Sequence, residues 1–284
     1  MKEKVLYVKL PENTKYRRVK VTEDGMIGIV YSEECACACR TKKETMKAKV
    51  EIPKPKALVG GSVVYKKDNL PYWYCKIKNG RDEFFHLYME DLTEEDLLYD
   101  SKTGEKRTFD TGSKKKFKKH VLKALANRPE EGFRWIPVYE PSLTPNGELR
   151  FVKTEKTLVG LKCHEWTKKL IKYSPENESD MSSKTTYYLL LLRWLKDGVA
   201  TLEQLVDLEH DRNSKNVKSD SERKFGGLDG FLNSFKIVED TNSGSGYSLL
   251  GYGAGNKYQI ANFCYIKQLG NRSDESIALM ELKK

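Results

Sequence analysis

The sequence has no long hydrophobic run. None of its apolar stretches approaches the ~20 residues that a helix needs to span a bilayer. The first twenty residues also lack the apolar core and the small-residue cleavage site of a secretory signal peptide. We therefore expect no membrane partner and a cytoplasmic location. Hydrophobic residues make up only 38% of the chain, yet 11% aromatic residues are too many for a disordered protein, so one large or two modest domains are expected.

The compact motifs of common enzyme classes are also missing. The sequence contains neither the H-E-x-x-H of zinc proteases nor the G-x-S-x-G of serine hydrolases. The segment Gly251–Lys257 lacks the spacing of a phosphate-binding P-loop and indicates a turn between strands. Cys163, His164 and Glu165 are adjacent, so their side chains point in different directions, which does not suit a catalytic pair. We assign no catalytic residues and no cofactor, and an enzyme with a dispersed site stays an alternative.

Cysteine is sparse, with six in 284 residues. Three of them form the pattern Cys35-x-Cys37-x-Cys39, which on a strand places all three thiols on one face. A structural zinc site usually needs a second pair of cysteines or histidines, and the sequence has no such pair. We therefore assign no metal site and expect reduced thiols, with a metal or redox cluster at this triplet as the open alternative.

Basic residues exceed acidic ones, and the excess is concentrated. The chain has 51 Lys and Arg against 41 Asp and Glu, a net charge of +10. Residues 1–50 carry +5 and residues 111–175 carry +9, whereas residues 51–110 and 176–284 each carry −2. Such concentration is what a polyanion-binding surface requires. The alternative is a lysine-rich surface that only keeps the protein soluble.

The most basic segment is a predicted helix over residues 113–128. Phe117, Val121 and Leu125 recur at helical spacing, and Ser113 is the expected N-cap. Its lysines would cover nearly all of the exposed helix surface, where phosphates are natural partners. These lysines are Lys114, Lys115, Lys116, Lys118, Lys119 and Lys123. Arg17, Arg18 and Lys20 form a second basic patch.

The first 175 residues are predicted to be rich in β structure. A hairpin is expected between residues 19–21 and 26–31, and a three-stranded meander over residues 58–88 contains an Asn-Gly turn typical of hairpins. Alternation places Tyr72 and Tyr74 on one face of the meander. There they would stack the bases of a nucleic acid or, alternatively, pack beneath a loop.

The acidic, serine-containing stretch 176–183 is the predicted linker. It would separate a β-rich region with the basic helix, residues 1–175, from a second domain, residues 176–284. In the second domain we expect a helix over residues 185–197 that ends at Gly198, followed by a helix that begins at Thr201 with a capping box. A third helix is expected over residues 221–235, followed by short strands around a glycine-rich turn.

This order of elements is similar to that of a winged helix-turn-helix domain. The resemblance implies that the third helix, with Arg223 and Lys224, enters the major groove and that a wing with Lys257 contacts the backbone. Winged helices also serve as protein-binding modules, and the net charge of −2 in this third of the chain does not favour contact with nucleic acid.

The sequence thus predicts an α+β protein with a β-rich N-terminal region, a basic helix and a winged-helix-like C-terminal domain. The predicted function is non-catalytic binding of DNA or RNA, or of a nucleoprotein complex, through a basic surface. The alternative is a protein-interaction or assembly subunit, for instance of a phage or mobile element, whose basic face meets an acidic protein.

Overall fold

The computed structural model describes residues 18–21, 27–30, 52–67, 72–153, 158–206, 235–242, 246–251, 263–265 and 276–284. The chain divides into two compact units, residues 1–51 and residues 52–284. In the first unit, β1 (Arg18–Val21) pairs antiparallel with β2 (Ile27–Val30). The hairpin predicted for this segment is therefore confirmed.

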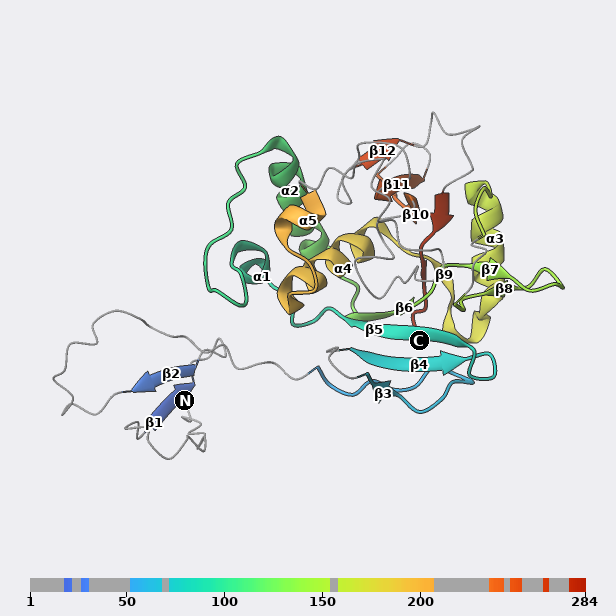
Figure 1. The fold of residues 1–284 in the computed structure, drawn as a ribbon, viewed down its shortest axis with the longest axis horizontal. Helices are drawn as coiled ribbons and strands as arrows, with labels where there is room; N and C mark the ends of the chain where they lie inside the picture. Colours follow the sequence, from blue (N-terminus) through green and yellow to red (C-terminus); the bar gives the residue numbers. More distant parts are fainter. Residues whose placement is uncertain are drawn as a thin grey trace. The chain divides into compact units, whose positions relative to one another are not determined.

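The second unit combines helices and strands in a mixed α+β fold, as predicted (Figure 1). Its helices are α1 (Glu94–Leu98), α2 (Gly112–Ala126), α3 (Cys163–Tyr173), the 3-10 turn η1 (Pro175–Asn177), α4 (Lys184–Asp197) and α5 (Leu202–Val206). Its strands are β3 (Tyr65–Lys66), β4 (Trp73–Ile77), β5 (Asp82–Tyr88), β6 (Phe133–Pro137), β7 (Ser142–Leu143), β8 (Leu149–Arg150), β9 (Asp180–Met181), β10 (Phe235–Glu239), β11 (Tyr247–Gly251), β12 (Phe263–Tyr265), β13 (Ser276–Ala278) and β14 (Met280–Glu281). Among these described helices, none has the length and apolar content that crossing a membrane requires.

The two strands predicted on either side of the Asn-Gly turn are confirmed, in a four-stranded antiparallel sheet with the order β3-β4-β5-β6. The first part of the predicted meander, residues 58–64, is not a strand, and β3 is limited to Tyr65–Lys66. The turn between β4 and β5 is unusual because Lys78, Asn79 and Gly80 all have positive φ angles, of 52°, 59° and 74°. Asparagine and glycine adopt this left-handed region at less cost than other residues. Ile77 pairs with Asp82, so the loop is longer than the two-residue turn typical of Asn-Gly.

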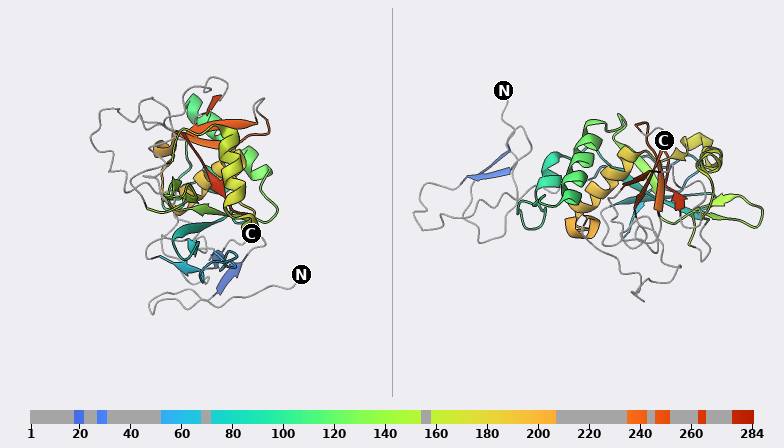
Figure 2. Two further views of the ribbon diagram at one scale, coloured as in Figure 1. Left: turned by 90° about the vertical axis from the view of Figure 1, so that its right-hand side faces the viewer. Right: turned by 90° about the horizontal axis from the view of Figure 1, so that it is seen from above.

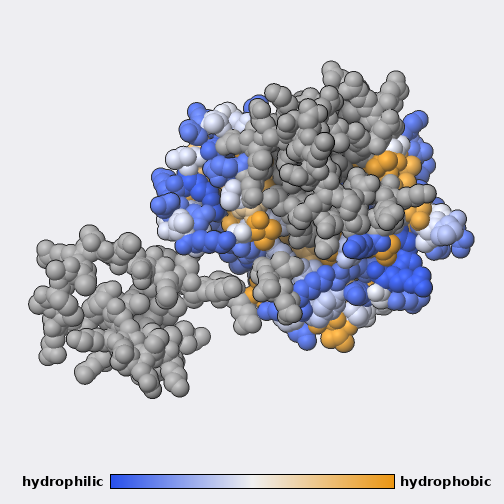
Figure 3. Space-filling view, viewed as in Figure 1, coloured by the Kyte–Doolittle hydropathy of each residue, from blue (hydrophilic) through white to orange (hydrophobic). Residues whose placement is uncertain are grey.

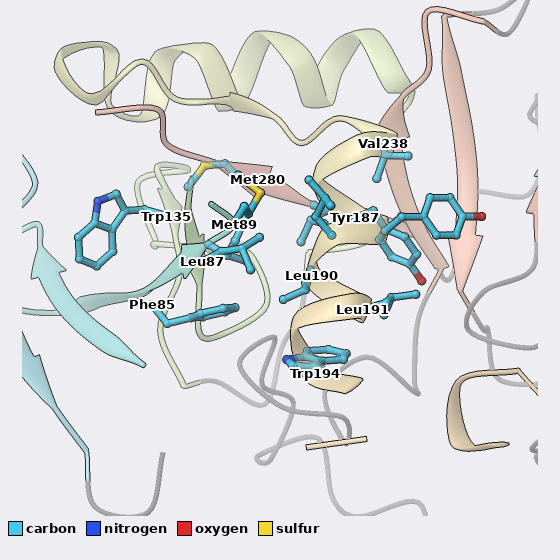
Figure 4. Packing of buried hydrophobic residues seen from close by; sticks show 14 of the residues in the cluster. Phe85, Leu87, Met89, Trp135, Tyr187, Leu190, Leu191, Trp194, Val238 and Met280 are labelled. Carbon is cyan, nitrogen blue, oxygen red and sulfur yellow. The ribbon is translucent and has the colours of Figure 1, made fainter. Parts of the chain in front are cut away.

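Helix α4 forms the centre of the core and lies between this sheet and a second four-stranded sheet (Figures 1 and 4). The sequence indicates a single apolar face, yet every residue from Thr186 to Leu195 is buried, as is typical of a helix enclosed on all sides. The Ser183 hydroxyl accepts a hydrogen bond from the Thr186 amide at 3.1 Å. Gly198 ends the helix with a left-handed φ of 68°, which confirms the predicted glycine stop.

The second sheet has the order β12-β11-β10-β13. Strands β10 and β11 confirm two predicted strands, but the chain end adds two that the sequence pattern did not indicate. β13 pairs parallel with β10, and β14 pairs antiparallel with β9. Leu282 also bridges to Trp135 of β6, so residues 276–282 connect the two sheets. The predicted domain boundary after residue 175 falls inside this unit.

The stretch 176–183 is not a linker, and that prediction was wrong. Asn177, Ser179 and Ser182 are at most 4% exposed. The Val59 amide donates to Asn177 Oδ1 at 2.8 Å, and Asn177 Nδ2 donates to the Val59 carbonyl at 3.1 Å. Polar side chains that find such partners are buried in spite of their polarity.

Part of the predicted winged helix falls outside the described residues. This applies to residues 221–234, which hold most of the third helix, and to residues 252–257 of the wing. Helix α5 does begin at Leu202, where the capping motif places it. Phe235, expected at the end of the third helix, instead begins β10. The winged-helix resemblance therefore stays a prediction.

Candidate nucleic-acid interface

The basic helix is present as α2, with its start shifted by two residues. Thr111, rather than Ser113, is the N-cap, and its hydroxyl accepts a hydrogen bond from the Lys114 amide at 3.2 Å. At the C-terminal end, the backbone amide of Asn127 donates hydrogen bonds to the carbonyls of Lys123 and Ala124. The shift is consistent with threonine also being a good N-cap residue, which periodicity alone does not distinguish from serine.

One side of α2 is fixed against the core. Phe117, Val121 and Ala124 are at most 3% exposed, and α2 lies beside α1 and α4 (Figure 2). Phe117 packs against Tyr188 of α4 with ring centroids 6.3 Å apart, and His120 stacks on the same tyrosine at 4.9 Å. These contacts leave the opposite side of the helix toward solvent.

Four lysines occupy that solvent side. Lys115, Lys116, Lys119 and Lys123 are all exposed, and at 3.6 residues per turn they project within an arc of about 100°. Within the described part of the chain, none of the four has a carboxylate at ion-pair distance. We call these four residues the lysine stripe.

The two other predicted lysines of α2 are engaged by the protein itself. Lys114 is 8% exposed, and its Nζ lies 3.5 Å from Glu203 and 3.8 Å from Asp110. Lys118 is half-buried with its Nζ 5.3 Å from the centre of the Phe109 ring. Both side chains therefore contribute less to an external contact than the sequence indicates.

The first turn of α2 lacks the negative charge that the helix dipole favours there. Helices favour acids at the N-terminal end, where the macrodipole is positive, and α1 follows this rule with Glu94, Glu95 and Asp96. The first turn of α2 has no acidic residue, and lysines follow at once. The pKa of the His120 side chain is lowered, mainly because the ring is buried and then because Lys184 of α4 and Lys119 of α2 lie nearby. The described surface over α1 and the loop that leads to α2 is mostly hydrophilic (Figure 3).

The stacking role predicted for Tyr72 and Tyr74 is corrected by their burial. The two rings are 0% and 1% exposed, because this face of the sheet is covered rather than open. Tyr72 packs against Phe85 at 5.5 Å and Tyr74 against Tyr65 at 5.9 Å. Both tyrosines belong to the core, which agrees with the alternative expectation that they are packing residues.

Of the other predicted contact residues, the structure describes only Arg18 and Lys20. Both lie in β1 of the first unit. Arg17, Arg223, Lys224 and Lys257 lie outside the described residues and stay predictions.

The Cys35, Cys37 and Cys39 triplet also lies outside the described residues. Among the residues that the structure describes, no group of histidine, cysteine and acidic side chains is arranged to hold a metal ion. Burial raises the pKa of the Cys163 thiol, which disfavours the thiolate form that a nucleophile needs.

Sequence reasoning missed one feature, a second group of basic and aromatic side chains on β3 and β4. Alternation groups Trp73 with Cys75 and Ile77 on one face of β4, but Trp73 is half-buried while those two are at most 2% exposed. The signal that would have found it is the density of lysines on either side of this tryptophan in the sequence.

The chain matches no protein-family model, and neither curated proteins nor solved structures show a significant similarity to it.

Proposed function

We propose that this protein is a non-catalytic nucleic-acid-binding protein, or part of a nucleoprotein complex, that contacts phosphates through the lysine stripe of α2. The observation that carries the proposal is the grouping of four exposed lysines in one arc without carboxylate partners among the described residues. Phosphates along a nucleic-acid backbone present closely spaced negative charge to such a stripe.

The rigid support of the stripe favours a binding role over simple solubility. Phe117 and His120 pack helix α2 against Tyr188 of α4. The backbone positions from which the four lysines project are therefore fixed relative to one another and to the core. A surface that serves only solubility usually mixes charges of both signs. The stripe has one sign, and its Lys115 lies in a first turn that has no acidic residue, where the helix dipole does not favour a cation.

The proposal includes a cytoplasmic location, which is supported by two thiols. Cys75 and Cys163 are free in the structure, and a reducing compartment keeps cysteines in this state. Nucleic acids are accessible partners in that compartment.

The test compares binding of duplex DNA, RNA and heparin at physiological salt. The variant replaces Lys115, Lys116, Lys119 and Lys123 by glutamine, which keeps the helix propensity of lysine. We expect its affinity for nucleic acid to fall about 100-fold or more, because each lost phosphate contact removes favourable counterion release.

The matched control removes the same charge elsewhere. Lys153, Lys162, Lys168 and Lys172 are also exposed, and their replacement by glutamine gives the same net charge. This control should bind nearly as tightly as the wild type. If both variants lose affinity equally, only total charge matters and the stripe is not a site. If polyglutamate binds the stripe more tightly than nucleic acid does, the partner is an acidic protein.

A further inference from the structure

A second basic surface lies along β3 and β4, at the edge of the first sheet. Residues 52–81 contain seven Lys and Arg residues but only one acidic residue, Asp68, and one of the seven, Lys67, is paired with Glu83 of β5 at 2.8 Å. The net charge of −2 for residues 51–110 conceals this excess, because most of the acids come after residue 81. Hydrophilic residues dominate the lower part of the second unit, with a small hydrophobic spot among them (Figure 3).

Trp73 differs from the other tryptophans of the protein. Of the four in the sequence, Trp135, Trp166 and Trp194 are at most 1% exposed, whereas Trp73 is only half-buried. Its Nε1 donates a hydrogen bond to the Ile52 carbonyl at 3.0 Å, which fixes the orientation of the ring.

Two lysines lie over the Trp73 ring. The Nζ of Lys66 is 4.6 Å from the ring centroid and that of Lys54 is 5.9 Å away. Lys66 pairs with Trp73 across β3 and β4, and β3 is an edge strand among the described strands. A fixed aromatic ring with two flexible cations is therefore presented at a sheet edge.

We propose that Trp73 stacks one base of a single-stranded nucleic acid while Lys54 and Lys66 bind the adjoining phosphates. The proposal rests on the proposed function in taking nucleic acid as the ligand, but it uses other residues and specifies the single-stranded form. The charge of this surface complements a polyanion, and an indole ring offers a base the flat apolar surface that stacking requires.

The two ammonium contacts that a base would replace are weak. An exposed contact between an ammonium and an aromatic ring changes an equilibrium by only a few-fold. Stacking of a base on an aromatic side chain contributes roughly 5- to 150-fold. When a base displaces the ammonium groups from the ring, each of them can donate a hydrogen bond to an adjoining phosphate.

The single-stranded form follows from the accessibility of base faces. In a duplex, bases stack on one another and cover the faces that Trp73 would contact, whereas single strands expose them. A duplex would meet only the lysines of this edge.

The experiment titrates the full-length protein with an oligothymidylate strand and follows tryptophan fluorescence. Because the other three tryptophans are buried, a change in emission reports mainly on Trp73. We expect the single strand to quench the emission at saturation, and a duplex of equal length to quench it much less.

Variants separate stacking from charge. Trp73→Ala should bind the single strand about tenfold more weakly and duplex DNA as tightly as the wild type. Trp73→Phe keeps an aromatic ring and should retain most of the affinity. This control distinguishes a loss of stacking in Trp73→Ala from a loss of folded structure. Replacing Lys54 and Lys66 by glutamine should lower the slope of log affinity against log salt by about 1.4 for the single strand.

The outcomes also separate this inference from the proposed function. Glutamine variants of the lysine stripe that bind duplex DNA normally would overturn the proposed function, and the effect of Trp73→Ala on the single strand would still stand. Saturation with oligothymidylate without quenching, or unchanged affinity in Trp73→Ala, would overturn the inference. Equal quenching by polyglutamate would also overturn it, by showing that the ligand is an acidic peptide.

Discussion

Helices α2 and α4 pack against each other and have similar lengths. They differ in that Arg193 of α4 is buried in ion pairs, whereas the lysine stripe of α2 is exposed without ion pairs among the described residues. Arg193 of α4 is 3% exposed, and its guanidinium lies 2.7 Å from Asp91 and 2.6 Å from Asp197. The lysine stripe of α2 is exposed and has no such partner among the described residues. The protein therefore pairs the cations that hold its core together and leaves unpaired the cations that we assign to a ligand.

The largest effect on stability should come from removing Arg193, the ion-paired cation of α4. Arg193→Met leaves Asp197 without its cation, while Asp91 keeps Lys196 at 2.9 Å, and we expect the free energy of unfolding to fall by about 3 kcal/mol. Urea denaturation measures the loss. Lys115→Met, which removes an exposed cation from α2, should change stability by no more than about 0.5 kcal/mol. Equal effects of the two changes would erase the distinction between the helices.

His86 is buried like Arg193, but it has no hydrogen-bond partner among the described residues. His86 is 3% exposed among Tyr88, Phe133 and Trp135, and neither ring nitrogen has a hydrogen-bond partner among the described residues. Burial lowers its pKa from 6.5 to about 4. Between these values the unfolded chain takes up a proton that the folded protein does not, so stability falls as the pH decreases.

This shift predicts a loss of about 3 kcal/mol between neutral pH and pH 4. His86→Phe should remove that part of the pH dependence while other titrating groups continue to act. The measurement is the free energy of unfolding of both proteins across this range. Parallel curves for the variant and the wild type would show that His86 does not titrate as described.

A smaller effect tests where α2 begins. Thr111→Ala removes the hydroxyl that accepts from the Lys114 amide and should cost about 1 kcal/mol of stability. Ser113→Ala changes a residue inside the helix and should have almost no effect. The reverse result would restore Ser113 as the cap and move the lysines relative to the helix dipole.

Local signals were enough to predict the elements that carry the candidate site. The apolar spacing of Phe117 and Val121 predicted α2, and Gly198 predicted the end of α4. These features depend on the few residues around them, so they can be read without knowledge of the rest of the chain.

Burial on both sides of an element could not be predicted in the same way. Alternation separates Tyr72 and Tyr74 from Trp73, but it does not show that the tyrosine face is covered and that Trp73 is partly open. The burial of Asn177 depends on hydrogen bonds to Val59, 118 residues away in the sequence. Contacts between distant segments of this kind have no local signature.

The most direct test of the central claim is the salt dependence of duplex DNA binding by the wild type and the glutamine variant of the lysine stripe. Our account predicts that the slope of log affinity against log salt falls by roughly 3–4, at about 0.9 per lost phosphate contact, while the free energy of unfolding is nearly unchanged. An unchanged slope would show that these unpaired lysines do not contact phosphates and would contradict the account.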